Sequence, residues 1–215
     1  MIYLAYIAIF LRIFPVVLQW NSYSKRNLGS LYFLLFSFFS LISDLIGIFF
    51  NYFRIHTDGV FNIYQIFETV IVTYLAIEIG KFNRKIRVIL FASCFVQGLL
   101  TLVYTFNYKF DYPQDYNWGV SRIYILIITF LAALHFVRNI NQYNKINAAP
   151  LIGLLGVFIY EALSIIPMLS QQLQRTSINP AQTFVIYFVF MVSGNLIRDA
   201  LISFNAIFYK KHKRV

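Results

Sequence analysis

The chain has 215 residues, of which 60% are hydrophobic and 12% are charged, and its net charge is +10. A soluble domain would carry roughly a quarter charged residues, so the composition excludes an ordinary soluble protein. Most of the basic residues fall in short segments at the ends of apolar runs, which argues against a nucleic-acid surface. The single cysteine, Cys94, excludes both an internal disulfide framework and a cysteine-based metal site.

Seven apolar runs follow one another along the chain. They cover residues 2–20, 30–52, 60–79, 87–106, 119–137, 149–169 and 181–207. Each is close to the roughly 20 residues that a helix needs to cross a hydrocarbon core. We therefore predict an all-α integral membrane protein with seven transmembrane helices and the lipid bilayer as its surroundings. The first run lacks a basic leader and a cleavage site, so we expect it to remain as a helix.

The loop charges predict the orientation in the membrane. Twelve lysines and arginines fall on one side of a seven-helix arrangement and three on the other. The positive-inside rule then places the N-terminus outside and the C-terminus, with its basic tail 208–215, in the cytoplasm. We expect a plasma membrane such as the bacterial inner membrane.

A shift of 117 residues superposes polar positions of the first and last thirds of the chain. The aligned pairs are Asn62 with Asn179, Gln65 with Gln182, and Asp44 with Glu161. Because polar residues are scarce in these runs, the pairs favour a duplicated three-helix unit. The units would span about 1–80 and 119–207, joined by a linker helix over about 86–106. Two triplets separated by one helix have the same orientation, so the repeat would be parallel.

The segment "FPVVLQWNSYSKRNLGS" contains Pro15, then Gln19, then a basic stretch that ends in Gly-Ser. With the 3+1+3 arrangement, this segment resembles the PQ-loop and SWEET-type transporters and the KDEL receptors, although Pro15 and Gln19 are not adjacent. Asn62 and Asn179 are similar to the asparagines in the third helix of each SWEET-type triplet, but they sit nearer the helix mouth. The resemblance implies a small-solute transporter.

Four charged residues are expected at one depth in the membrane. Arg12, Asp44, Glu68 and Glu161 each lie about eight to ten residues from the outer end of their run, or roughly 12–15 Å along a helix. A charge at the bilayer centre costs at least roughly 2.5–3.5 kcal/mol, so each needs a partner or a function. Arg122 is near enough to extend toward this layer or to point outward.

The third run carries a polar stripe. Asn62, Gln65 and Glu68 fall within an arc of about 120° on a helix. This stripe predicts the wall of a polar cavity that opens to the outside. The alternative is that the charges pair only to hold helices together.

A second polar cluster is predicted near the inner end of the last run. Asn195, Arg198 and Asp199 have i, i+3 and i+4 spacing and share one helix face. They form either a structural ion pair or an inner gate.

These patterns leave three classes of function open. The first is transport or binding of a small polar, zwitterionic or cationic solute; its binding residues would be Arg12, Asp44, Asn62, Gln65, Glu68, Glu161, Asn179 and Gln182. The second is a non-catalytic partner or sensor subunit that binds another protein or a second copy. The third is a membrane-embedded acid–base hydrolase that uses some of the same carboxylates.

Catalytic, metal and cofactor sites are not expected. The three histidines lie outside the charged layer, which leaves Ser43 and Asp44 without a base and weakens a zinc site. The last run has no lysine before Lys210, so a retinal Schiff base is excluded.

Overall fold

The computed structural model describes residues 2–22, 28–53, 58–107, 115–139, 149–174 and 180–212. These residues form eight α-helices and no β-strand. The helices are α1 (Ile2–Leu11), α2 (Ile13–Ser22), α3 (Leu28–Tyr52), α4 (Asp58–Gly80), α5 (Arg84–Asn107), α6 (Asp115–Arg138), α7 (Ala149–Gln174) and α8 (Pro180–His212). Five of them, α3 to α7, are long and apolar enough to cross a membrane. The all-helical fold therefore fits a multi-pass membrane protein, as predicted.

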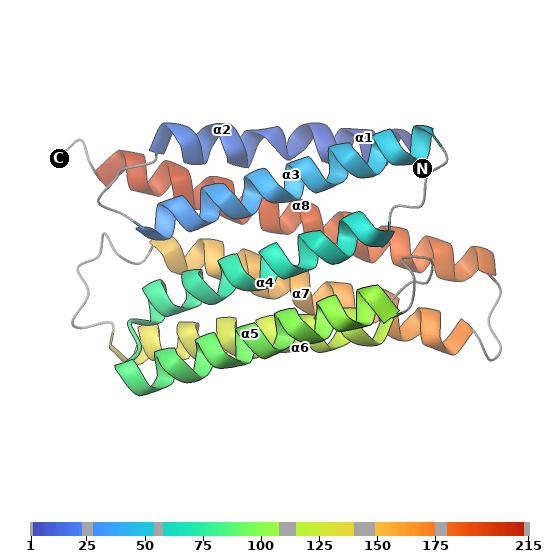
Figure 1. The fold of residues 1–215 in the computed structure, drawn as a ribbon. Helices are drawn as coiled ribbons and strands as arrows, with labels where there is room; N and C mark the ends of the chain where they lie inside the picture. Colours follow the sequence, from blue (N-terminus) through green and yellow to red (C-terminus); the bar gives the residue numbers. More distant parts are fainter. Residues whose placement is uncertain are drawn as a thin grey trace.

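The first apolar run differs from prediction because it is two helices rather than one. α1 ends at Leu11 and α2 begins at Ile13, and the intervening turn is closed by the Arg12 amide, which donates to the Ile9 carbonyl at 3.1 Å. Pro15 explains the interruption. Its ring has no N–H to offer the Leu11 carbonyl and clashes with that carbonyl in a regular helix. The two helices still run end to end along one edge of the bundle (Figure 1).

Six of the described helices form a closed ring. α2 packs against α3, α3 against α4, α4 against α6, α6 against α7, α7 against α8, and α8 returns to α2. α5 lies outside this ring, mainly against α4 and α6, and only 22% of its apolar span is buried. The rest of this span faces away from the other helices.

The apolar core is concentrated between α4, α6 and α7. Fully buried side chains there include Leu75, Ile125, Ala132 and Val157. This part of the ring is therefore filled with hydrocarbon.

Close contact between α7 and α8 depends on Gly156. A Cβ atom there would lie 2.9 Å from the Leu201 Cβ and 3.1 Å from the Arg198 carbonyl oxygen. A small residue allows two helix backbones to approach in a membrane. The approach here positions the part of α8 that carries Arg198.

Candidate functional site

Arg12 stands at the centre of the first ion network. Its Nη1 pairs with an Asp44 carboxylate oxygen on α3, and its Nε pairs with Asp199 Oδ2 on α8 at 3.2 Å. The interruption between α1 and α2 places this residue at the junction of three helices. Arg12 is only 3% exposed, so protein carboxylates balance its charge and bulk water does not solvate it.

Arg198 and Ser40 complete the first network. Arg198 Nε donates to Asp199 Oδ1 at 2.9 Å, and its Nη2 donates to the Ser40 hydroxyl oxygen at 3.2 Å. The same oxygen accepts from Arg12 Nη1 at 3.1 Å. Ser40 thus bridges the two guanidinium groups, and the network ties α3 to α8.

Arg122 on α6 is the centre of a second network. Its Nη1 lies 2.7 Å from Glu161 Oε2 on α7 and 3.4 Å from Glu68 Oε2 on α4. The Tyr64 hydroxyl, one turn before Glu68, donates to Glu68 Oε1 at 2.8 Å. Both carboxylates are among the largest fully buried side chains, so their charges face a single guanidinium in a low-dielectric environment.

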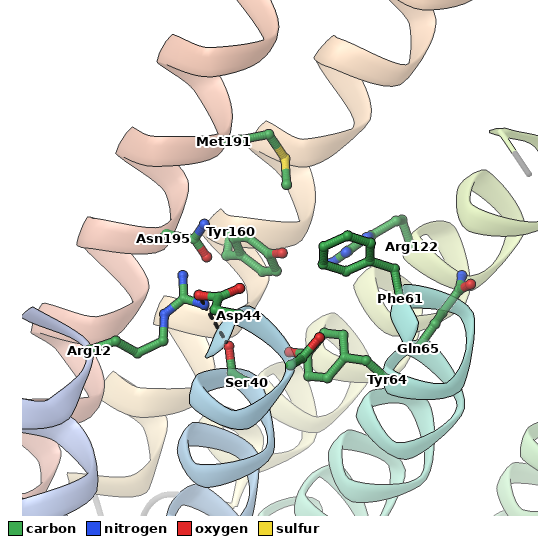
Figure 2. A pocket seen from close by; sticks show the side chains of 11 residues that line it. Arg12, Ser40, Asp44, Phe61, Tyr64, Gln65, Arg122, Tyr160, Met191 and Asn195 are labelled. Atoms are coloured by element: carbon green, nitrogen blue, oxygen red, sulfur yellow. Dashed lines mark hydrogen bonds and ion pairs between the residues drawn. The ribbon is translucent and has the colours of Figure 1, made fainter. Parts of the chain in front are cut away.

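Tyr160 lies between the two networks. The guanidinium carbon of Arg122 is 4.9 Å from the centre of its ring, and that of Arg198 is 4.5 Å away. Figure 2 shows the ring between the Arg12 and Asp44 side and the Arg122 and Gln65 side. An aromatic ring attracts cations through its negative face. Tyr160 therefore connects the two networks electrostatically.

A cavity of about 100 Å³ lies where the networks face each other. Its lining comes from α3, α4, α6, α7 and α8 and from Arg12 between α1 and α2, and it is large enough for several water molecules or a small solute. The lining residues are Arg12, Ser40, Ser43, Asp44, Phe61, Tyr64, Gln65, Arg122, Tyr160, Met191 and Asn195. The Ser43 hydroxyl and the Asn195 carbonyl oxygen have no hydrogen-bond partner among the described residues.

The structure brings together most of the residues expected in the charged layer. Arg12 pairs with Asp44, while Glu68 and Glu161 share Arg122. The polar stripe on α4 is buried, with Asn62, Gln65 and Glu68 each at most 3% exposed. Gln65 lines the cavity directly.

The residues predicted as a separate cluster near the inner end of the last run are not separate from the first network. Asp199 contacts Arg12 and Asn195 lines the cavity, so the residues expected near the inner end belong to the central site. Asn195, Arg198 and Asp199 lie near the middle of α8 (Pro180–His212). α8 has 33 residues, and its N-terminal end projects beyond the neighbouring helices (Figure 1). Arg198 and Asp199, which are adjacent in the sequence, do contact each other.

The second half of the polar alignment falls largely outside the described structure. Asn179 is not among the described residues, and Gln182 lies in the first turn of α8 without a described side chain. Their predicted roles in binding stay predictions.

Two aromatic members of the site, Tyr64 and Tyr160, were not predicted from the sequence. Tyr64 lies four residues before Glu68, which is a spacing that allows contact on a helix. Tyr160 directly precedes Glu161. The chain contains 16 tyrosines, so these two could not be distinguished from tyrosines at membrane boundaries or in packing positions.

The two networks repeat one pattern of helices. Arg12, just before α2, pairs with Asp44 on the next helix, α3, and Arg122 on α6 pairs with Glu161 on the next helix, α7. Arg12 also pairs with Asp199 on α8, and Arg122 also pairs with Glu68 on α4. The register differs, because the 117-residue shift carries Arg12 to Thr129 and not to Arg122. The similarity is therefore one of helix positions and not of residue numbers.

The described residues contain no group of three or more histidine, cysteine, aspartate or glutamate side chains that could hold a metal ion. Comparisons with protein-family models, curated proteins and solved structures find no match for this chain. The geometry of the site is thus the basis for assigning a function.

Proposed function

We propose that the central cavity binds a small solute that carries a positive charge, most simply an organic ammonium ion. The charge of the two networks as a whole supports this ligand, although of their seven charged groups only Arg12, Asp44 and Arg122 line the cavity itself. The two networks contain three guanidinium groups and four carboxyl groups, so their sum is −1 when all are ionised. A bound cation would neutralise this charge, and a proton could take its place when the site is empty.

The aromatic lining supports the same chemistry. Phe61 and Tyr64 line the cavity beside Tyr160, and aromatic rings are recurrent partners of ammonium groups. The cavity volume of about 100 Å³ limits the ligand to a few non-hydrogen atoms. The unpartnered oxygens of Ser43 and Asn195 are acceptors for the N–H groups of such a solute.

We further propose that the chain crosses the membrane seven times as two parallel triplets. The order of helices in the ring is compatible with a two-fold axis that carries the first triplet onto the second. The repeated pairing of arginine with acids from two other helices supports the same axis. This arrangement would make the protein a transporter related in plan to PQ-loop and SWEET-type proteins, with the solute bound between the triplets.

Thermal stability of the purified protein tests ligand binding. Methylammonium, ethanolamine and guanidinium would be compared with acetate and glycerol at equal ionic strength. A cation that binds only the folded state at 100 times its Kd stabilises that state by about 2.7 kcal/mol. We expect a rise in Tm with at least one cation and none with acetate or glycerol.

Two substitutions of the same kind on one helix provide the control. Glu68→Gln removes the additional negative charge of the second network, whereas Glu78→Gln changes an exposed residue farther along α4. We expect Glu68→Gln to abolish the cation-dependent rise in Tm and Glu78→Gln to keep it. A rise that survives Glu68→Gln would contradict the proposed site. If no solute changes the Tm of the wild type, the networks only hold helices together, as in a partner subunit.

Binding and transport are distinguished by uptake of the same cation into proteoliposomes. A transporter should accumulate the labelled cation down its gradient, and Glu68→Gln should remove this uptake. Binding without uptake would assign the site to a sensor or partner subunit.

A further inference from the structure

A file of buried polar groups continues from the first network toward the end of the bundle where α2 and α8 finish. Ser37 and Ser30 on α3, Gln19 on α2 and Asn205 on α8 are each at most 2% exposed. The two serine hydroxyls, the Gln19 side-chain oxygen and both polar side-chain atoms of Asn205 have no hydrogen-bond partner among the described residues.

Helical spacing places these groups on the faces that form the first network. Ser30, Ser37 and Ser40 have spacings of seven and three residues, so they lie on one side of α3. Arg198 and Asn205 are also seven residues apart and share a face of α8. The file therefore begins at the network and extends about 10 Å along α8 and about 15 Å along α3.

Gln19 joins the two sides of this file. Its Nε2 donates to the Ile202 carbonyl oxygen at 2.9 Å, which places the α2 side chain at the level between Arg198 and Asn205. We call the interface that these residues line, between α2, α3 and α8, the polar seam. Figure 1 shows that the start of α3 and the ends of α2 and α8 lie at the same end of the bundle as the C-terminus.

The corresponding interface in the other half of the ring has a different character. Between α4, α6 and α7, the apolar core fills the positions from the second network toward the C-terminal end of the bundle; it includes Leu75, Ala132 and Leu154. In this sealed interface, the buried Thr73 and Thr129 hydroxyls donate to backbone carbonyls of their own helices. The polar seam instead contains polar atoms that the described protein groups do not satisfy.

Buried polar atoms in proteins are almost always hydrogen-bonded, and ordered water supplies the partner where protein does not. We propose that the polar seam is hydrated and is the access route between the central cavity and the C-terminal end of the bundle. At the end next to the central cavity, the route is closed by the network of Arg12, Ser40, Asp199 and Arg198. Separation of α3 from α8 would break this network and join the seam to the cavity.

Cysteine labelling tests the hydration. In a Cys94→Ser background, Ser30→Cys, Ser37→Cys and Asn205→Cys would each be treated with a charged, membrane-impermeant methanethiosulfonate. This reagent reacts with thiolate, which forms only where water is present. It would be added to sealed vesicles from one side at a time, with a tag showing the side on which the C-terminus lies.

The chain offers matched controls for each position. Phe38 and Phe204 are neighbours of seam residues but are 45% and 54% exposed toward the outside of the bundle. Ala132 is fully buried in the sealed interface, six residues before the end of α6. We expect the seam cysteines to react at least about tenfold faster than Phe38→Cys, Phe204→Cys and Ala132→Cys, and only from the C-terminal side.

Two results would overturn the inference. One is that the seam cysteines are as unreactive as the three controls; the other is that they react from the side opposite the C-terminus. Serine to cysteine changes little in volume, so Ser30→Cys and Ser37→Cys preserve a measurement if Asn205→Cys fails to fold. The seam can be hydrated whether or not the cavity binds a cation, so this result is independent of the Tm experiment.

Discussion

Arg12 holds two carboxylates from different helices, so its removal is the most direct test of the first network at the residue scale. Arg12→Leu leaves Asp44 without its guanidinium partner and deprives Asp199 of one of two. Breaking a buried ion pair costs about 3–5 kcal/mol because the remaining charge is uncompensated. We expect a large fall in the Tm measured in detergent.

A second substitution identifies the cause of that fall. Arg12→Leu combined with Asp44→Asn should recover part of the stability, because the amide no longer carries a stranded charge. Phe14→Leu, at a residue that is 54% exposed two positions away, should change the Tm little. A wild-type Tm for Arg12→Leu alone would show that the charged network does not stabilise the fold.

Tyr160 provides a second test at the residue scale. Its ring lies within 5 Å of two guanidinium carbons, and cation–π contacts that are shielded from water contribute about 2 kcal/mol each. Tyr160→Phe keeps the ring and should retain most of the stability. Tyr160→Leu keeps apolar volume but removes the ring, so it should lower the Tm clearly. Equal Tm values for the two variants would exclude the proposed link between the networks.

Single residues explain why the site could be predicted only in part. Arg12, Asp44, Glu68 and Glu161 stood out because charges are scarce in apolar runs, and all four take part in the networks. Their pairing was not predictable, since depth along a helix does not say which neighbour a side chain faces. Arg122 was recognised as being within reach of the layer, but not as the partner of two glutamates.

At the scale of elements, Gly156 controls how closely α7 and α8 pack. The nearest atoms to a new Cβ include the Arg198 carbonyl oxygen, which is backbone and cannot move independently of its helix. Gly156→Ala should push α8 away and destabilise the fold by about 1–3 kcal/mol. Gly98→Ala on α5 is the control, because a Cβ there meets nothing within 4 Å. We expect Gly98→Ala to leave the Tm unchanged or to raise it, since alanine favours a helix over glycine.

If Gly156→Ala and Gly98→Ala gave the same Tm, close packing of α7 on α8 would not position the first network. Unfolding in detergent, followed by circular dichroism, would measure both variants under the same conditions.

The elements themselves were predicted well because apolar runs of membrane length leave few alternatives. The expected run 87–106 became α5 (Arg84–Asn107), and 60–79 became α4 (Asp58–Gly80). The prediction of one helix over the first run was wrong, because the run's apolar character does not show that Pro15 interrupts the hydrogen bonding of the Leu11 carbonyl. The contact of Asp199 with Arg12 was not predicted, because the apolar run does not show that α8 projects beyond its neighbours.

At the scale of the whole molecule, the two networks connect the two halves of the chain. Arg12 pairs with Asp199, and Arg122 pairs with Glu68, so each network has a salt bridge that crosses between α1–α4 and α6–α8. The Arg198 to Ser40 hydrogen bond also crosses. In a membrane, where apolar side chains gain little by leaving lipid, such polar contacts and close packing determine which helices associate.

This connection predicts how a divided protein should behave. If the chain is split between residues 107 and 115 and both fragments are co-expressed, we expect them to assemble in the membrane and co-purify. Asp199→Asn in the second fragment removes a charge that Arg12 and Arg198 share, and Glu68→Gln in the first removes a partner of Arg122. Either substitution should reduce co-purification, and both together should reduce it further. Glu78→Gln should not, because that residue is exposed. Undiminished assembly of the doubly substituted fragments would mean that apolar packing alone holds the halves together, and the buried charges would then be free to serve a ligand.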